Sequence, residues 1–381
     1  MTETPFTIQF AAAILEDLTS RLLAARFAPR VGRARWDGGA DPEYLRELVT
    51  YWAEEFSWQD QQDHLNSYDH AIVDVDGIPI HVVRVGARNL AGADPIPILL
   101  LHGWPSCFVE MLPLADRLAD PSRFGLTDGR SFDVVIPSLP GFLFSGLPDA
   151  ELTRAEIGRL MHKLMAELSH ERYMVFGGDI GGGAAARMGA LYPDHVIGLH
   201  LIHPPYRIDR DLDQTELAYL DLVARYDQSD GGYSEIMLTR PDTIAAALID
   251  SPVGLAAWII DKFHDWVDHD GNLENRVSRD TLLTIVMLYW ATGSIGSSFA
   301  TYFDYEHNEP QPSIAVPVAV TLSRERSRID FPRQLSSRVC NDIRFWSLPD
   351  AGGHFMALEQ PDLIWADILI STDRMLSAPD G

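Results

Sequence analysis

Residues 173–183 read Tyr173-Met174-Val175-Phe176-Gly177-Gly178-Asp179-Ile180-Gly181-Gly182-Gly183. The apolar half of this stretch predicts a short strand, and the run 182–191 predicts a helix, so the chain must turn abruptly between them. At such a turn the apex residue has strained backbone angles, and small neighbours let the two backbone segments approach closely. Gly177 and Gly181 meet that requirement. The stretch therefore predicts a strand-turn-helix unit with Asp179 at its apex.

Asp179 is predicted to be a nucleophile. Turns of this kind commonly carry a serine in the pattern G-x-S-x-G, and here the same pattern carries an aspartate. The positive end of the helix dipole helps to keep that carboxylate ionised. An ionised carboxylate can attack a saturated, electrophilic carbon and form an ester in which the enzyme supplies the acyl half. The alternative is an ordinary turn in which Asp179 only caps the helix.

Composition and charge exclude several classes of function. The chain has 381 residues, which suffice for one large domain with additions or for two domains. Its formal net charge of −25 opposes binding to nucleic acid or anionic membranes and favours a neutral substrate. Cys107 and Cys340 are too few for a disulfide framework or a cysteine metal cluster. With no basic and apolar leader and no apolar run long enough for a membrane span, we expect a cytoplasmic protein.

The pattern along the chain predicts four parts. Residues 1–70 contain two amphipathic helices and form an N-terminal helical arm, which we expect to cover one side of the main domain. Strands alternate with helices in residues 71–203 and again in 313–381, which predicts the two parts of an α/β core with a doubly wound, mostly parallel sheet. Residues 204–312 lack strands and predict a helical lid over the carboxyl ends of the strands. Its helices are predicted at 211–226, 241–250, 254–268 and 280–291.

Two backbone donors are predicted beside Asp179. In the α/β-hydrolase fold, the loop after an upstream strand supplies one N–H group to the oxyanion hole, and the residue after the nucleophile supplies another. These are the N–H groups of Trp104, in His102-Gly103-Trp104-Pro105, and of Ile180. His102 is expected to be a structural histidine that bonds nearby loop backbone. The substrate pocket is predicted to include Trp104, Phe142 and Phe355.

His354 is the predicted base, since it lies near the end of the chain on a Gly-Gly-His-Phe loop, as the order nucleophile, acid, histidine requires. An acid must orient its imidazole and stabilise the imidazolium that forms. Glu325 is the preferred acid because it follows the apolar run 316–322, the position at which this fold places its acid. Asp330 and Asp304 are also candidates for this role.

No metal or cofactor is expected. His200 and His203 lie three residues apart at a strand end, without the third nearby ligand of the usual zinc pattern. The run 268–272 is too short for a calcium loop. The sequence contains no phosphate-binding glycine loop of the G-x-x-x-x-G-K-[ST] type, and no strand-linked G-x-G-x-x-G.

These motifs, in this order, resemble those of the microsomal-type epoxide hydrolases, α/β-hydrolases that open epoxides to vicinal diols. The resemblance covers nearly the whole chain, including the arm with its Trp52 and Trp58. The matching motifs are His102-Gly103-Trp104-Pro105, Pro137-Ser138-Leu139-Pro140-Gly141-Phe142, Gly177-Gly178-Asp179-Ile180-Gly181 and Gly352-Gly353-His354-Phe355-Met356-Ala357-Leu358-Glu359. The resemblance implies a small hydrophobic epoxide as substrate and no cofactor, and it is compatible with a homodimer.

The same resemblance implies two lid tyrosines that hold and protonate the epoxide oxygen. Tyr233 and Tyr302 are similar to that pair. One departure is that the family's phenylalanine-proline before the acid is replaced by Ser323-Arg324, and this weakens the assignment of Glu325. Two other functions stay open: an α/β-hydrolase dehalogenase, which would need halide donors where the tyrosines stand, and a non-catalytic ligand-binding relative.

Overall fold

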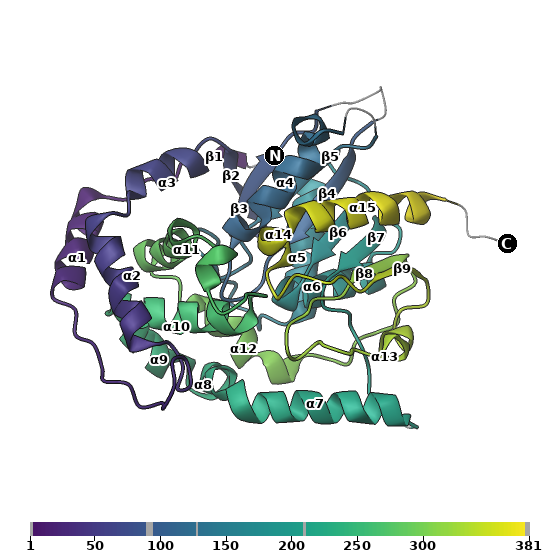
Figure 1. Cartoon of the computed structure of the whole chain (residues 1–381). Coiled ribbons are helices and arrows are strands. Elements are labelled where there is room, and N and C mark those ends of the chain that lie inside the picture. The colour runs from purple at the N-terminus through teal and green to yellow at the C-terminus, as the bar shows by residue number, and fades with distance from the viewer. Residues whose placement is uncertain (1–2, 89–93, 127–128, 209–210, 378–381) are drawn as a thin grey trace.

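A nine-stranded sheet forms the centre of this computed structural model, which describes residues 3–88, 94–126, 129–208 and 211–377. The strand order is β1-β2-β3-β5-β4-β6-β7-β8-β9 (Figure 1). Strands β1, β2, β3 and β5 pair antiparallel in turn, and every neighbouring pair from β5 to β9 is parallel. The bounds are β1 Glu3–Pro5, β2 Asp69–Val75, β3 Ile78–Val85, β4 Ile96–Leu101, β5 Phe132–Pro137, β6 Tyr173–Gly177, β7 Val196–Leu201, β8 Val318–Thr321 and β9 Ile343–Ser347.

The central strands are apolar throughout because helices cover both faces of the sheet. All five residues of β6 are buried, as a strand in the middle of a parallel sheet requires. Helices α4 and α15 pack together on one face, and α5 and α6 pack together on the other (Figure 1). This arrangement confirms the predicted doubly wound sheet. The helices of the core are α4 Leu112–Ala119, α5 Arg154–Glu167, α6 Asp179–Leu191, α13 Arg333–Ser337, α14 Met356–Glu359 and α15 Pro361–Leu376.

The segment between β7 and β8 is helical and covers the carboxyl ends of the parallel strands (Figure 1). Its inner helices are apolar on most sides, and eight consecutive residues of α11, 282–289, are buried. The sequence predicts four of these helices but neither α8 nor α12. The bounds are α7 Gln214–Asp230, α8 Gly232–Thr239, α9 Pro241–Leu248, α10 Pro252–Trp266, α11 Arg279–Thr292 and α12 Ala300–Phe303.

In the described part of the chain, no single helix is both long and apolar enough to cross a membrane. Two pairs of lid helices satisfy the same criteria of length and composition only when taken together, α9 with α10 and α11 with the segment 297–303, and each pair is sharply bent.

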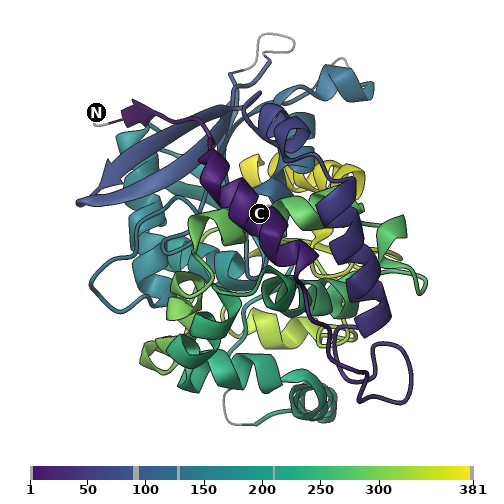
Figure 2. The ribbon, with the colours of Figure 1, turned by 90° about the vertical axis from the view of Figure 1, so that its left-hand side faces the viewer.

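The N-terminal arm consists of β1, α1 Ala12–Leu23, α2 Pro42–Glu54 and α3 Trp58–Leu65. Helix α3 occupies a segment that the sequence leaves unassigned. Strand β1 extends the sheet at β2, whereas the helices lie against the lid: α1 and α2 contact α10, and α3 contacts α11 (Figure 2). The Tyr51 hydroxyl donates a 2.8 Å hydrogen bond to Asp280 of α11. The arm therefore spans core and lid, rather than covering the core alone.

Candidate active site

The turn between β6 and α6 is as sharp as the sequence predicts. Asp179 has a φ of 50°, in the left-handed region that side chains other than glycine rarely adopt. A Cβ atom on Gly181 would lie 2.3 Å from the carbonyl oxygen of Leu101, and one on Gly177 would lie 2.8 Å from the carbonyl carbon of Gly181. Only glycine fits at these two positions, because the atoms that a side chain would meet are backbone.

The upstream loop holds the Asp179 carboxylate from one side. The backbone N–H of Trp104 donates to Oδ1 of Asp179 over 3.0 Å. A Cβ on Gly103 would lie 2.5 Å from Cβ of Asp179, so this residue must also be glycine for the loop to come so near. Ile180 is the second residue of α6, beside the carboxylate, but among the described residues its N–H forms no hydrogen bond to Asp179.

The structure brings the predicted acid and base together. Nδ1 of His354 is hydrogen bonded to Oε2 of Glu325, and Nε2 of the same ring lies 3.9 Å from Oδ2 of Asp179. The remaining two candidate acids do not reach the imidazole: Asp330 is exposed, and Asp304 accepts a hydrogen bond from the backbone N–H of Leu152.

Two further donors hold the acid in place. Oε1 of Glu325 accepts from Oγ of Ser327 over 2.7 Å and from Nε of Arg328 over 3.1 Å. Burial by itself would raise the pKa of the Glu325 carboxyl, but the hydrogen-bonded His354 ring and Arg328 hold it well below its usual range. Glu325 is therefore ionised and fixed at both oxygens.

The pKa of His354 is raised to about 9. Burial is the largest single influence and lowers the pKa by favouring the neutral ring, but the charge and hydrogen bond of Glu325, with smaller contributions from Asp179 and Glu110, together outweigh it. Glu110 is a buried carboxyl that the sequence does not single out, and its burial raises its own pKa to about 8. In the resting site the imidazolium is thus favoured at neutral pH.

Tyr233 lies in the first turn of α8 and Tyr302 lies in α12, and their ring centroids are 6.4 Å apart. The Tyr233 ring stacks on Trp104 at 5.5 Å, and the Tyr302 ring meets Trp104 edge-on at 5.9 Å. Burial, followed by the charge of Asp179 for Tyr233 and by Tyr233 itself for Tyr302, raises the pKa of each phenol well above its usual value. Both hydroxyls are therefore protonated and available as donors.

Lys262 is a second residue that sequence reasoning misses. Its side chain is buried in α10, and its ammonium group lies 4.7 Å from the centroid of the Tyr233 ring. The same group pairs with Asp230, at the end of α7, and with Asp261 over 3.1 Å. Asp230 precedes Tyr233 by three residues, so Lys262 fixes both the ring and the backbone that leads to it. An apolar helix with one lysine gives no sign of this role.

His203 is the third missed residue. It follows β7, and its Nδ1 accepts a 2.7 Å hydrogen bond from the backbone N–H of Asp179. Its Nε2 lies 3.5 Å from Oε2 of Glu325, and its ring centroid lies 4.6 Å from that of His354. Burial lowers the pKa of His203 to about 3, which keeps the ring neutral.

The fold thus supplies the third ligand that the sequence around His203 lacks. Nitrogen or oxygen atoms of His203, Glu325 and His354 lie within 4.8 Å of one another, close enough for a metal ion. The carboxylate of this trio is already bonded by His354, Ser327 and Arg328, whereas Nε2 of His203 is buried and makes no hydrogen bond within the described residues. His102 forms loop contacts only, as expected: one ring nitrogen bonds the Gly103 carbonyl and the other accepts from the N–H of Leu139.

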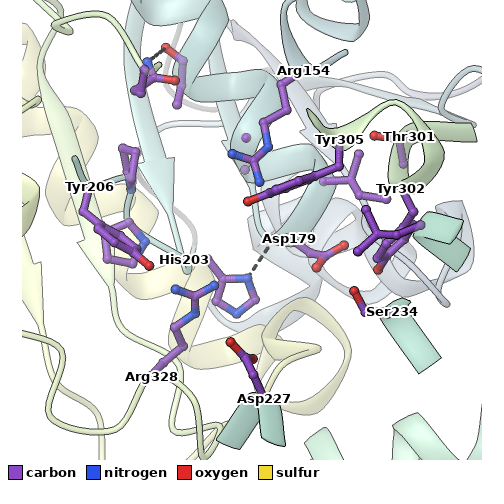
Figure 3. Close-up of a pocket in the computed structure, with 18 of the residues that line it drawn as sticks. Arg154, Asp179, His203, Tyr206, Asp227, Ser234, Thr301, Tyr302, Tyr305 and Arg328 are labelled. Atoms are coloured by element: carbon purple, nitrogen blue, oxygen red, sulfur yellow. Dashed lines mark hydrogen bonds between the residues drawn. The ribbon is translucent and has the colours of Figure 1, made fainter. Parts of the chain in front are cut away.

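A cavity of about 730 Å³ opens onto Asp179 (Figure 3). The loop after β7, the first turns of α6, and the lid helices with Tyr233 and Tyr302 line it. Trp104, Phe142 and Phe355 are not among its lining residues. Each of these rings is fully buried against other aromatic rings, for example Phe355 against Phe263 at 4.2 Å. The cavity wall is consequently more polar than the predicted aromatic lining.

Family models and a curated relative match most of this chain. A family model described as "Epoxide hydrolase N terminus" matches residues 3–111, and one described as "alpha/beta hydrolase fold" matches residues 96–240. Epoxide hydrolase 1 of Sus scrofa is 33% identical to the chain, over 96% of this chain and 87% of the relative.

Solved structures resemble the whole chain as well. The juvenile hormone epoxide hydrolase of the silkworm Bombyx mori has a TM-score of 0.85 at 29% identity, covering 98% of this chain and 94% of that one. The epoxide hydrolase of Aspergillus niger has a TM-score of 0.83 at 27% identity, covering 98% and 97%.

Proposed function

The chain belongs to the epoxide hydrolase family, and we propose that it converts its epoxide to a vicinal diol in two steps, through a covalent ester on Asp179. The observation that carries this proposal is that the two oxygens of the Asp179 carboxylate have different neighbours. Oδ1 accepts the Trp104 N–H, while Oδ2 faces His354. Oδ2 is therefore the oxygen that attacks the epoxide carbon, and Oδ1 becomes the carbonyl oxygen of the ester.

In the first step the carbon–oxygen bond of the epoxide breaks as the bond to Oδ2 forms. The departing oxygen becomes an alkoxide, which is a poor leaving group unless a proton donor meets it. Tyr233 and Tyr302 supply hydrogen bonds to that oxygen. Support for this role comes from their position at the cavity that contains Asp179 and from their raised pKa values, which keep both phenols protonated.

In the second step a water molecule attacks the acyl carbon of the ester, which is the side-chain carboxyl carbon of Asp179. His354 takes the proton from this water, and Glu325 stabilises the imidazolium. As the bond between the acyl carbon and Oδ2 breaks, the imidazolium returns the proton to Oδ2, so the diol leaves with its new oxygen derived from Oδ2. The charge that develops on Oδ1 meets the N–H of Trp104, and the N–H of Ile180 is the proposed second donor.

Formation of the ester also prepares the base. The negative charge of Asp179 is one of the influences that raise the pKa of His354. Esterification removes that charge, so the pKa of His354 falls and the neutral imidazole becomes accessible when it is needed. The nucleophile and the base are thereby used in sequence.

A dehalogenase would use the same aspartate and histidine. A halide departs without a proton, however, and needs donors that stay fixed around an anion. Two phenols at the cavity, with pKa values raised by burial, suit an oxygen that must be protonated as it leaves. A non-catalytic binding relative would have no need for a strained Asp179 or for an acid bonded to His354.

We propose a cytoplasmic location for the enzyme, which the two unpaired and buried cysteines, Cys107 and Cys340, support. Cell fractionation tests this. Whether the enzyme also forms a homodimer is a separate question, which sedimentation velocity at several protein concentrations answers.

A single turnover in ¹⁸O-water tests the covalent mechanism. With enzyme in excess over an aryl or alkyl epoxide, the diol should contain no ¹⁸O, and the label should be found in the peptide with Asp179. Label in the diol of the first turnover would mean that water attacks the epoxide directly. Halide release from haloalkanes without diol formation from epoxides would favour the dehalogenase.

A further inference from the structure

We propose that the substrate is an epoxide that carries a carboxylate, and that Arg154 binds this carboxylate while the epoxide lies at Asp179. The inference rests on the proposed epoxide hydrolysis and names the class of epoxide. Arg154 is the first residue of α5 and lines the same cavity as Asp179. Figure 3 shows its guanidinium pointing into the cavity beside the ring of Tyr305.

The position of the Arg154 side chain is well defined. Its stem lies across Gly183 in α6, where a Cβ atom would be only 2.8 Å from Cδ of the arginine. Its guanidinium carbon lies 5.0 Å from the centroid of the Tyr305 ring. Tyr305 is 50% exposed, so this pair stands at the mouth of the cavity. The arginine is held by an aromatic ring and a glycine, and neither of these neutralises its charge.

Within the described residues, the guanidinium of Arg154 has neither a hydrogen bond nor a carboxylate partner. The other arginines of the cavity wall differ: Arg328 pairs with Glu325, and Arg207 donates to the carbonyl of Arg338. An arginine that faces a cavity without a partner presents its fork of donors to whatever enters.

The surrounding charges favour an anion at this position. Arg187 of α6 lies near enough for the positive charge of Arg154 to contribute to its lowered pKa, after burial. The Nε of Arg187 is itself buried without a hydrogen-bond partner. Arg187 lies outside the cavity lining and donates to the Glu309 carbonyl through its terminal nitrogen, but its positive charge adds to that of Arg154. A bound anion would relieve the repulsion between them.

The charge and length of the anion are also limited. Asp179, Asp227 and Glu235 line the same cavity, and their negative charges oppose a phosphate dianion more than a single carboxylate. The side chain of Arg154 crosses α6 at Gly183, four residues and so about 6 Å along the helix axis from Asp179. A carboxylate attached directly to the epoxide is too short to span this separation, whereas one at the far end of an alkyl chain can reach.

This local preference modifies the expectation from the net charge. A chain of charge −25 repels anions at long range, yet ionic screening weakens that effect beyond about 8 Å at physiological salt. Inside the cavity, the carboxylate of the substrate interacts most strongly with the nearby guanidinium of Arg154. Recognition at Arg154 therefore selects among epoxides after they arrive.

The test compares an ω-epoxy fatty acid with its primary amide, which has the same shape and no charge. The ratio of kcat/KM for acid to amide should favour the acid in the wild-type enzyme. Arg154→Gln should reduce this ratio roughly 10- to 100-fold, the usual effect of losing a hydrogen-bonded ion pair. Arg154→Lys should retain part of the preference, since it keeps the charge but loses the bidentate fork.

Arg159→Gln is the matched control. Arg159 lies on the same helix, pairs with Glu156 and Asp76, and lies outside the cavity wall. Its replacement should leave the ratio at the wild-type value. A wild-type ratio near one, or equal losses for acid and amide in Arg154→Gln, would overturn the proposal and make Arg154 a packing residue.

Binding of octanoate and octanamide, measured by calorimetry, separates this inference from the proposed reaction. Preferential binding of octanoate that is lost in Arg154→Gln would support the anion site even if no diol forms. If diol forms from neutral epoxides but octanoate binds no better than octanamide, the reaction stands and the carboxylate site fails. Should Arg154→Gln not fold, the same two comparisons with Arg154→Lys decide.

Discussion

The backbone N–H of Asp179 donates a hydrogen bond of 2.7 Å to Nδ1 of His203. Because Nδ1 accepts, the proton of the neutral ring is on Nε2, which lies 3.5 Å from Oε2 of Glu325. One imidazole therefore lies between the strained backbone of the nucleophile and the acid that orients the base. This contact makes His203 a positioning residue of the site.

His203→Phe should slow ester formation, because it leaves the N–H of Asp179 buried without an acceptor. Such a loss should also lower the free energy of unfolding by about 1–3 kcal/mol. His203→Gln, whose amide oxygen can accept, should recover most of the rate. Single-turnover kinetics and urea unfolding measure the two effects. A glutamine variant no faster than the phenylalanine variant would show that His203 acts through packing alone.

Hydrolysis of the ester should speed up as the pH rises, because it requires neutral His354. Since esterification removes the charge of Asp179, the midpoint of this rise should lie below 9, the approximate pKa of His354 in the free enzyme. Ester formation should vary little over the same range, as the tyrosines stay protonated. Rapid-quench mass spectrometry from pH 6 to 10 follows both steps.

His354→Gln provides the control for this profile. The ester should accumulate in that variant at every pH, since attack on the epoxide does not need the imidazole. Glu325→Gln should impair hydrolysis far more than Asp330→Asn, whose carboxyl is exposed. The reverse order would move the role of the acid to Asp330.

Replacing Tyr233 or Tyr302 with Phe should slow ester formation and leave ester hydrolysis nearly unchanged. A positioned general acid is worth roughly 10²- to 10⁴-fold, and two donors to one oxygen partly substitute for each other. Each single variant should therefore lose less than the double variant, which should be close to inactive on epoxides. Wild-type rates in the double variant would exclude proton donation by these residues.

Lys262→Met should destabilise the fold by about 3 kcal/mol, because it leaves the Asp230 carboxylate next to Lys262 without its partner. The double variant Lys262→Met with Asp230→Asn should recover much of that loss. Urea unfolding of the wild type, the two single variants and the double variant gives the interaction energy between Lys262 and Asp230. If the ammonium also holds the Tyr233 ring, ester formation should stay slow in the double variant. Recovery of stability and rate together would limit Lys262 to a structural role.

Local sequence predicts the turn at Asp179 well because the requirement is itself local. A strand, glycines at fixed offsets and a helix are all visible within eleven residues, and φ of Asp179 agrees. The doubly wound, mostly parallel sheet follows from the same alternation of apolar runs and helices. These are features that short-range patterns determine.

The contacts of His203 and Lys262 could not be read in that way. His203 lies 24 residues from Asp179, and the bond between them depends on how the loop after β7 folds back over the turn. Helix α8, which carries Tyr233, is short, begins at Gly232 and has one buried residue, Met237, so it shows no helical periodicity. Side chains that meet only through tertiary packing leave no periodic trace in the sequence.

The arm has a mechanical consequence. It is fixed at two places, at the sheet edge through β1 and at the lid through Tyr51 and through Arg21, which pairs with Asp250. Because the arm joins the lid to the edge of the sheet, the lid cannot rotate away from the core as a rigid body unless β1 separates from β2 or the arm helices separate from α10 and α11. Substrate and diol must then pass through the cavity mouth, where rotation of the half-exposed Tyr305 ring is fast compared with a domain hinge. Heat should accordingly melt arm, lid and sheet in one transition, with no earlier loss of the lid.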